Sequence, residues 1–485
     1  MSRQEARIDP YLILITCGIF TALFGLAYIL FSFYTIIAIV VGAGIVLYQL
    51  YSLKGNLSSK FKHGEKLPSL FLLFLLFTPI ALGIVVGFDS YLIYESAMRT
   101  ILVWGLTLTF WSTLLFVPLA LYSKYKEDLL PTQREFPRLS VIVPAYNEEK
   151  VIARTIEGLI ETQYPKKEII VVDDGSKDRT FEIAQRYKNA IKVLHKENGG
   201  KASAVNYGLS YATGEVIVIV DADTIIGRDS LIHIVKGFGL SKDVAAVAGN
   251  IKVRNRMNWL TWCQAIEYVA GIQIVRRALD VFGAISVVPG ALGAFRKSAL
   301  GEIGTYDKDT VVEDFDVTMK ILKSKLVIQG STKATAYTES PQTIRGLYNQ
   351  RRRWYGGNME VFARHSDALI NPRYGLLQRM VFPFMIFSSM VMPFIGIIAW
   401  ANAIIAIIYG DSLFVLELFA IFSLLQCLQA ALAVRLDNED PKLIPYAIFL
   451  VVGFKQILDV LLIMATLRWI FKKKARWTSA ERIGI

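Results

Sequence analysis

Three acidic pairs in the middle of the chain have the residue types and spacing that cation binding and proton transfer require. They are Asp173–Asp174, Asp221 with Asp223, and Glu313–Asp314. Asp221 and Asp223 stand two positions apart, so on an extended backbone they point to the same side and could give oxygen ligands to a hard divalent cation. Such a cation would let a diphosphate bind beside carboxylates. The alternative is a solvated loop, the usual role of an isolated Asp-x-Asp.

Asp173 and Asp174 follow a β-branched run and precede a glycine and a serine. Acidic residues at comparable strand ends accept hydrogen bonds from ribose hydroxyls or a nucleobase, so this pair is a candidate nucleotide site. A turn with a helix cap would explain the glycine, the serine and one acid equally well. Residues 198–201, Asn-Gly-Gly-Lys, form a second loop before a predicted helix, where backbone N–H groups and the Lys201 ammonium could contact phosphate.

The Glu313–Asp314 pair offers a general base. One carboxylate facing an acceptor hydroxyl could remove its proton while a new bond forms. The alternative is structural, because acidic residues in the first turn of the helix predicted over 315–322 are favoured by the helix dipole.

Gln350, Arg353 and Trp354 are spaced to share one face of a helix. The indole could stack on the apolar face of a sugar, while Gln350 and Arg353 could hydrogen-bond hydroxyls or neutralise a diphosphate. The alternative is a basic amphipathic helix at a membrane surface. Both interpretations are compatible if they concern different faces of the helix.

The elements that must position these residues alternate between strand and helix from residue 137 to about residue 345. Strand patterns cover 139–143, 168–172, 191–194 and 215–220, and helical patterns cover 151–162, 177–187 and 202–212. This alternation predicts a largely parallel, doubly wound sheet. Ligands of such sheets bind beyond the carboxyl ends of the strands, and the first two acidic pairs fall at those ends.

Long apolar stretches flank this domain, and 54% of the 485 residues are hydrophobic, so we predict an integral membrane protein. The stretches of spanning length are 11–31, 33–51, 69–88, 101–122, 380–409, 413–434 and 443–470. The first lacks a cleavage pattern and is expected to be retained. Pro383 and Pro393 interrupt the fifth, whose first part is expected to lie along the interface.

Loop charges predict the orientation of the chain. Four lysines, Lys54, Lys60, Lys62 and Lys66, lie between the second and third stretches. Such loops usually stay cytosolic, so the polar domain is predicted to face the cytosol in a multi-pass protein of the cell membrane. Three C-terminal spans would leave the basic tail outside, against the same rule, so two or three spans remain open.

The overall composition excludes several classes of function. The chain has a net charge of +12 but no nucleic-acid-binding motif. We therefore expect its basic residues to interact with anionic lipid headgroups rather than with nucleic acid. The three cysteines and four histidines are scattered singly, which argues against a disulfide framework or a zinc site. Carboxylates must therefore supply most of the chemistry.

With its motifs in this order, the stretch 137–360 resembles the membrane-embedded processive family-two glycosyltransferases, the group of cellulose, hyaluronan, chitin and poly-N-acetylglucosamine synthases. The resemblance implies an α/β GT-A (Rossmann-like) cytosolic domain, inserted between α-helical transmembrane regions. It implies inverting transfer from a UDP-sugar to a β-linked polysaccharide that leaves through a channel. Residues 249–250, 294–300 and 475–479 favour the poly-N-acetylglucosamine branch, whereas four N-terminal spans resemble cellulose synthase. The expected sugar is thus of N-acetylglucosamine or glucose type.

The same resemblance divides the chain into regions and implies roles for single residues. The regions are 1–122, with four spans; 123–136, a linker; 137–345, the GT-A domain; 346–379, interfacial amphipathic helices with the Gln-x-x-Arg-Trp motif; 380–470, the C-terminal transmembrane region; and 471–485, a basic tail. Nucleotide-sugar binding is implied for Pro144, Tyr146, Glu148, Asp173, Asp174, Lys201 and Asp221, and Mg²⁺ or Mn²⁺ binding for Asp223 with Asp221. Asp314 is the implied catalytic base, and the implied acceptor or diphosphate ligands are Glu313, Gln350, Arg353 and Trp354.

Polar residues within the last two apolar stretches are unusual for lipid-facing helices. They are Gln426, Gln429, Lys455 and Asp459, which we expect to line a saccharide channel, although Lys455 and Asp459 could instead form an internal ion pair. Two other functions stay open. One is transfer of a single sugar to a membrane lipid acceptor, and the other is a transporter or scaffold with a nucleotide-sensing domain. The sequence identifies no partner protein such as an accessory membrane subunit.

Overall fold

The computed structural model describes residues 9–30, 84–85, 87–130 and 136–472. Its polar domain is built on one sheet with the strand order β3-β2-β1-β4-β7-β6-β8-β5. The strands are β1 (Leu139–Ala145), β2 (Lys167–Asp173), β3 (Lys192–His195), β4 (Val216–Ile219), β5 (Ile225–Ile226), β6 (Val244–Val253), β7 (Gly293–Arg296) and β8 (Val327–Thr338). The first four lie where strand patterns predicted them.

The sheet is mixed rather than largely parallel. Strands β3, β2, β1 and β4 pair in parallel, as do β6 and β8. Strand β7 lies antiparallel between β4 and β6, and β5 pairs antiparallel with β8. All seven residues of β1 are buried, which is why this strand reads as an almost continuous apolar run.

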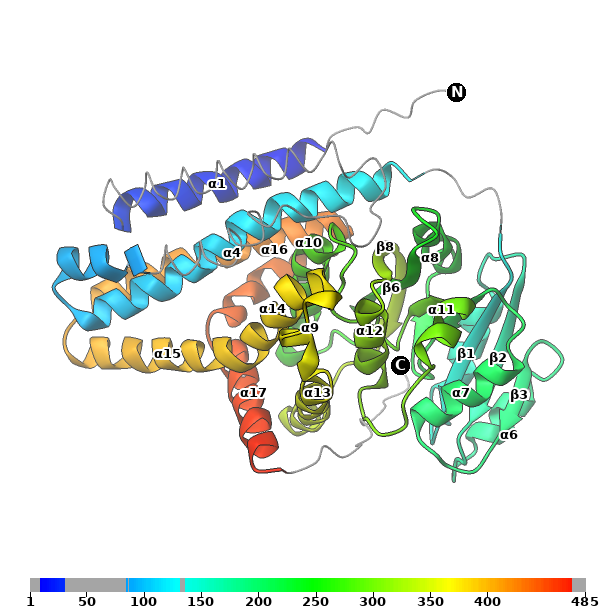
Figure 1. Ribbon diagram of the computed structural model, residues 1–485. Helices are drawn as coiled ribbons and strands as arrows, with labels where there is room; N and C mark the ends of the chain where they lie inside the picture. Colours follow the sequence, from blue (N-terminus) through cyan, green and yellow to red (C-terminus); the bar gives the residue numbers. More distant parts are fainter. Residues whose placement is uncertain (1–8, 31–83, 86, 131–135, 473–485) are drawn as a thin grey trace.

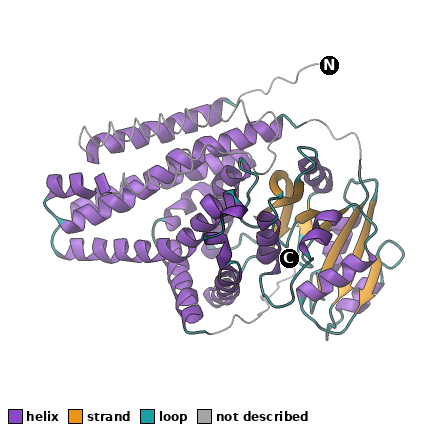
Figure 2. Ribbon diagram, viewed as in Figure 1, coloured by secondary structure: helices purple, strands orange, loops and turns teal. Residues whose placement is uncertain are grey.

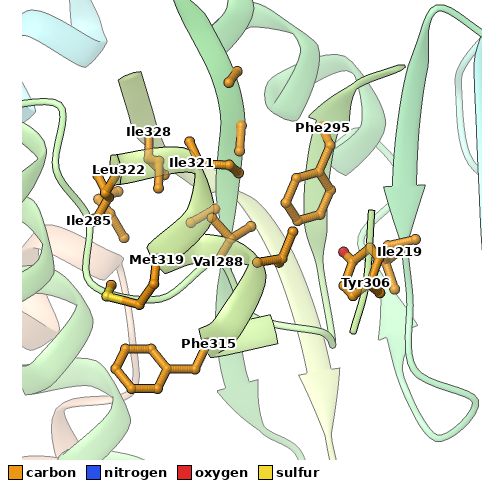
Figure 3. Packing of buried hydrophobic residues seen from close by; sticks show 14 of the residues in the cluster. Ile219, Ile285, Val288, Phe295, Tyr306, Phe315, Met319, Ile321, Leu322 and Ile328 are labelled. Atoms are coloured by element: carbon orange, nitrogen blue, oxygen red, sulfur yellow. The ribbon is translucent and has the colours of Figure 1, made fainter. Parts of the chain in front are cut away.

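Helices cover both faces of the sheet (Figures 1 and 2). They are α5 (Ile152–Ile160), α6 (Thr180–Gln185), α7 (Lys201–Tyr211), α8 (Ser230–Phe238), α11 (Lys297–Ile303) and α12 (Glu313–Lys323). One apolar layer contains the inward side of α12, with Met319 and Leu322 beside Ile285, and with Phe295 edge-on to Tyr306 at 6.0 Å between ring centroids (Figure 3). This packing holds the first turn of α12 at the edge where the parallel strands end.

A second group of helices lies between the sheet and the long apolar helices (Figure 1). It comprises α9 (Trp259–Ala270), which continues through a π-helical turn (Gly271–Arg276) into α10 (Arg277–Asp280), and α13 (Ile344–Arg364). Helix α13 carries the predicted Gln-x-x-Arg-Trp motif and packs against α17 (Phe454–Ile470).

The apolar helices form the other half of the molecule (Figure 2). They are α1 (Pro10–Leu30), α4 (Ala97–Asp128), α14 (Phe382–Ile386), α15 (Met392–Ile408), α16 (Ser412–Asp437) and α17. Within the described residues, the helical stretches Leu377–Ile408 and Ser412–Asp437 are long and apolar enough to cross a membrane, and a third span results if a bent pair counts as one. The predicted stretch 33–51, most of 69–88 and the tail from 473 lie outside the described residues.

The break in the C-terminal helices falls at a different place from the two prolines. The path from Leu377 to Ile408 stays helical because Pro383 and Pro393 each follow a wider π-helical segment, which accommodates a residue without a backbone N–H. Instead, Pro441–Leu450 and α17 meet at a bend of 54°. Gly453 at this bend has φ +91°, a conformation that glycine adopts readily.

Candidate functional site

Two cavities of about 470 Å³ each open beyond the carboxyl ends of the parallel strands. The strand cavity is bordered by Pro144, Tyr146, Glu148 and Asp174, and the α13 cavity by Asp314, Gln350 and Trp354. Six residues border both cavities: Lys201, Asp221, Asp223, Val311, Glu313 and Arg353. The two cavities therefore meet at a junction of charged side chains, and all the predicted acidic pairs contribute at least one residue to this region.

Asp174 fixes the loop that forms one wall of the strand cavity. Its carboxylate accepts hydrogen bonds from the backbone N–H groups of Gly199 (3.0 Å) and Gly200 (2.7 Å) and pairs with Lys196 at 2.6 Å. Gly175, at φ +72°, lets this loop approach, because a Cβ there would stand 2.7 Å from a backbone nitrogen. The loop places Lys201 at the first turn of α7, facing the junction.

Asp173 lies behind the cavity instead of bordering it. Its side chain is fully buried, and one carboxylate oxygen lies 2.7 Å from Nδ1 of His195. Neighbouring residues of a strand point to opposite faces, so only one member of this acidic pair can face the strand cavity. Asp173 could therefore affect a bound ligand only indirectly, by holding the end of β2 and the side chain of His195 in place.

Lys201 is the central cation of the junction. Its Nζ lies 2.6 Å from Oδ1 of Asp221 and 3.0 Å from Oε1 of Glu313. Burial alone would lower the pKa of this ammonium, but the charges of Asp221, Glu313 and Asp314 outweigh it and raise the pKa well above the usual value. Lys201 is therefore a permanent positive charge at the junction.

Asp314 occupies the first turn of α12 and faces the α13 cavity. The backbone N–H of Gly290 donates to its Oδ2 at 3.2 Å, and the N–H of Phe315 donates to its Oδ1 at 2.8 Å. Burial, followed by the charge of Glu313, raises the pKa of Asp314 to about 6. A carboxyl with this pKa is ionised at neutral pH and basic enough to take a proton.

The Asp221 and Asp223 carboxylates both border the junction. Asp223 is nearly buried, and the hydroxyls of Thr224 and Thr338 lie 3.2 and 3.5 Å from its carboxylate oxygens. Within the described ranges, no group of three or more His, Cys, Asp or Glu side chains could hold a metal by itself. The two carboxylates are oxygen donors that suit Mg²⁺ or Mn²⁺, provided that a phosphate or water supplies the remaining ligands.

The α13 helix presents Gln350, Arg353 and Trp354 to the α13 cavity, as their spacing predicted. The guanidinium of Arg351 lies behind them, 4.7 Å from the Trp354 ring centroid, and its Nη2 donates to Oε2 of Glu267 at 2.7 Å. Sequence reasoning missed Glu267, because an acid within the apolar pattern of α9 carries no signal for its partner 84 residues away.

A third cavity of about 260 Å³ lies among the apolar helices. Of the four predicted channel residues, Gln426, Lys455 and Asp459 border it. Gln429 does not, because its Nε2 donates to Oγ1 of Thr113 on α4 at 2.6 Å. Lys455 and Asp459 form the ion pair that was the alternative interpretation, with the ammonium 45% exposed and the carboxylate 2% exposed.

Lys455 and Asp459, which border the third cavity, act electrostatically on two residues that border the α13 cavity. Burial is the main cause of the raised pKa values of Glu267 and Tyr355, which border the α13 cavity. The charge of Lys455 acts on Glu267, and that of Asp459 acts on Tyr355. The two cavities are thus close enough for charges at one to be felt at the other.

Comparison with known proteins agrees with this geometry. Residues 140–304 match the model of the family described as Glycosyl transferase family 2. The chain is 35% identical over 229 residues to the poly-beta-1,6-N-acetyl-D-glucosamine synthase of Staphylococcus epidermidis, covering 47% of this chain and 56% of the relative. It is 34% identical over 233 residues to the synthase of the same name from Staphylococcus aureus strain COL, covering 47% and 57%. The chain therefore spans little more than half the length of these curated relatives.

Solved structures of similar fold include a mannosyltransferase. The mannosyltransferase PcManGT from Pyrobaculum calidifontis, in complex with GDP-Man and Mn²⁺, has a TM-score of 0.52 and is 22% identical, covering 78% of this chain and 100% of that one. The predicted GT-A fold is confirmed, with the mixed sheet described above in place of a mostly parallel one.

Proposed function

We propose that this protein is an inverting glycosyltransferase that extends a β-linked polysaccharide at a membrane with sugars from a UDP-sugar donor. The observation that carries the proposal is the junction of the two cavities. It joins the cavity at the strand ends to a second cavity that is bordered both by a carboxyl of pKa about 6 and by the side chain of Trp354.

The strand cavity is the proposed donor site. Its lining residues Pro144, Tyr146, Glu148 and Asp174 would surround the uridine, at the strand ends where such sheets bind nucleotides. Lys201 would meet the diphosphate as a permanent cation. Asp173 is proposed only as an indirect contributor, because its side chain is buried behind the cavity.

Asp221 and Asp223 are the proposed holders of an Mg²⁺ or Mn²⁺ ion. The Mn²⁺ bound with GDP-Man in the mannosyltransferase of similar fold supports a divalent cation. When bound, the cation neutralises the negative charge that develops on the leaving diphosphate. Asp221 would then share its carboxylate between the cation and Lys201, with which it pairs at 2.6 Å.

The proposed chemistry is one displacement at the anomeric carbon. The Asp314 carboxylate takes the proton from an acceptor hydroxyl as its oxygen bonds to that carbon, and the bond from the carbon to the diphosphate oxygen breaks. UDP leaves with the electron pair, and the anomeric configuration is inverted because only one displacement occurs. Trp354 would stack on the acceptor sugar, with Gln350, Arg353 and Glu313 as polar partners.

Polymerisation and export are favoured over transfer to a lipid for two reasons. Two relatives that match the chain are named as synthases of a polymer of N-acetylglucosamine, and the third cavity, among the apolar helices, is bordered by a charged pair. N-acetylglucosamine is therefore the proposed sugar. The proposed location is the cell membrane, with several spans and the polar domain in the cytosol, as the loop charges predict.

The test is to incubate the purified chain in lipid nanodiscs with a panel of UDP-sugars and Mg²⁺ or Mn²⁺, and to size the product. We expect a polymer from UDP-N-acetylglucosamine and loss of turnover with a chelator. A single sugar on an extracted lipid would establish the lipid-transferase alternative, and absence of UDP release from every donor would reject enzymatic transfer.

A further inference from the structure

Arg276 and Arg277, two adjacent arginines at the end of the π-helical turn, differ in whether their guanidinium groups form ion pairs. Arg277 is buried and satisfied, because it pairs with Glu127 at 3.0 Å and donates to Oε1 of Gln273 at 2.7 Å. The guanidinium of Arg276 forms no ion pair within the described residues, and its Nη2 is buried without a hydrogen-bond partner there. Successive helix positions point in different directions, which explains how neighbours of one type can differ so strongly.

The carboxylates nearest to Arg276 have other partners, although Oδ2 of Asp437 is buried without a hydrogen bond. Asp280 accepts from the hydroxyl of Ser123 at 2.8 Å and from the N–H of Gly330 at 2.6 Å. Glu127 pairs with Arg277, and Asp437 pairs with Lys252 at 3.3 Å. These acids supply a favourable field for Arg276 but no hydrogen bond, so its donors are left for another acceptor.

Arg276 borders the α13 cavity and not the strand cavity. Burial lowers the pKa of its guanidinium to about 10, partly offset by Asp280, so it stays charged at neutral pH. Arg276 as a whole is half-buried, but its buried Nη2 without a hydrogen-bond partner costs stability. Such a cost is typical of a residue that meets its partner only when a ligand binds.

We propose that Arg276 binds the saccharide acceptor, donating hydrogen bonds from its guanidinium to hydroxyl or carbonyl oxygens of a sugar residue in the α13 cavity. The inference rests on the proposed function, since it places the acceptor on the Asp314 and Trp354 side of the junction. Arg276 is a binding residue outside the predicted motifs, contributed by the helix that follows α9.

The charges around the cavity identify the chemical class of this ligand as an uncharged sugar. The α13 cavity is bordered by six carboxyl groups and three cationic side chains, and two of the six, Glu267 and Glu339, pair with Arg351 and Arg254 outside the lining, which leaves a small excess of negative charge. The carboxylate of an acidic sugar would therefore approach an excess of negative charge, whereas a hydroxyl or an N-acetyl carbonyl oxygen would accept from Arg276 without that penalty.

The test compares Arg276→Met with wild type in nanodiscs, using UDP-N-acetylglucosamine as donor and a β-1,6-linked N-acetylglucosamine pentasaccharide as acceptor. We expect the acceptor KM to rise about 10- to 100-fold, because hydrogen bonds to a charged group are lost, while the donor KM stays within about twofold. Arg276→Lys keeps the charge and should recover part of the acceptor affinity. The exposed Arg186→Gln is the surface control, with both KM values unchanged.

Thermal unfolding separates binding from folding. Arg276→Met should not lower Tm, because the charge that it removes has no ion pair, whereas Arg277→Met should lower Tm by leaving Glu127 unpaired. A well-folded Arg276→Met protein with a wild-type acceptor KM would reject the inference, as would a rise in donor KM alone. A wild-type chain without transfer would instead reject the proposed function.

Discussion

The Asp314 carboxyl combines two properties that a general base needs. It borders the cavity that we assign to the acceptor, and burial together with the neighbouring Glu313 raises its pKa to about 6. A raised pKa means that the protonated, inactive form persists to higher pH than for an ordinary aspartate. We expect kcat/KM for transfer to be constant above pH 7 and to fall about tenfold per pH unit below 6. Initial rates with labelled donor between pH 4.5 and 8.5 would measure this, and a flat profile would contradict it.

Asp314→Asn tests the same group by substitution. The amide keeps the shape but cannot accept the proton, so we expect kcat to fall about 10²- to 10⁴-fold. The Kd for UDP, measured calorimetrically, should change little because Asp314 does not border the strand cavity. Asp309→Asn, an exposed acid in the preceding loop, is the control with normal kcat. Normal turnover of a purified Asp314→Asn protein would remove Asp314 from this role.

At single positions, sequence reasoning predicted which residues lie near one another better than it predicted which way each side chain points. Lys201, Asp221, Asp223 and Asp314 meet at the cavities as their motifs predicted. Asp173 was predicted with Asp174, but the alternation of a strand turns it away from the strand cavity. Arg276 could not have been found, because its signal is the absence of a partner, which only the packing reveals.

At the scale of elements, local periodicity predicted the alternating strands and helices to within a few residues. It gave no strand beyond residue 220, so β5 to β8 were not predicted, among them β7, which has only four residues and lies antiparallel between β4 and β6. Whether a strand pairs in parallel or antiparallel depends on which strands, distant in the sequence, lie beside it. The sequence of a short apolar segment does not identify those neighbours. The prolines near α14 and α15 were misleading for a similar reason, since π-helical turns absorb them.

Helix α13 is held to α9 by the Arg351–Glu267 pair, and Arg351 also lies against the Trp354 ring. We therefore expect Arg351→Met to lower Tm by leaving the half-buried Glu267 without its ion pair, and to raise the acceptor KM. Adding Glu267→Gln should restore much of the Tm but not the acceptor KM, because the indole still lacks its support. Trp354→Ala should raise the acceptor KM similarly while donor hydrolysis changes less.

The measurement is thermal unfolding together with KM for the pentasaccharide in the single and double variants. A cation–π contact contributes about 0.5 to 2 kcal/mol, so the KM effect that Arg351 adds through Trp354 should not exceed roughly 30-fold. Recovery of both Tm and KM in the double variant would show that Arg351 only stabilises the fold. Equal losses of transfer and donor hydrolysis in Trp354→Ala would count against stacking on the acceptor.

At the scale of the whole molecule, buried ion pairs join the sheet domain to the apolar helices. Lys252 on β6 pairs with Asp437 at 3.3 Å and with Glu439 at 3.2 Å, at the end of α16, and Arg256 pairs with Glu439 at 2.8 Å. Charges buried at such a contact need fixed geometry to be satisfied. The contact therefore holds the α13 cavity in a constant position relative to the third cavity, which a path for a growing saccharide requires.

If the growing saccharide passes through the third cavity, it should contact one of the two glutamines of α16 and not the other. Gln426 borders the third cavity, whereas Gln429, less than one turn further along, hydrogen-bonds to Thr113 and does not. A photoreactive phenylalanine analogue at position 426 should cross-link to radiolabelled product during turnover, and the same analogue at position 429 should not. Leu424, which is 56% exposed on the outside of the helix, is the control for product that merely associates with the nanodisc.

The labelled adduct should appear only with a donor that supports polymerisation, and its saccharide should lengthen with reaction time. Equal labelling at positions 424 and 426, or none at 426 in an active protein, would mean that the product leaves the α13 cavity by a route other than the third cavity.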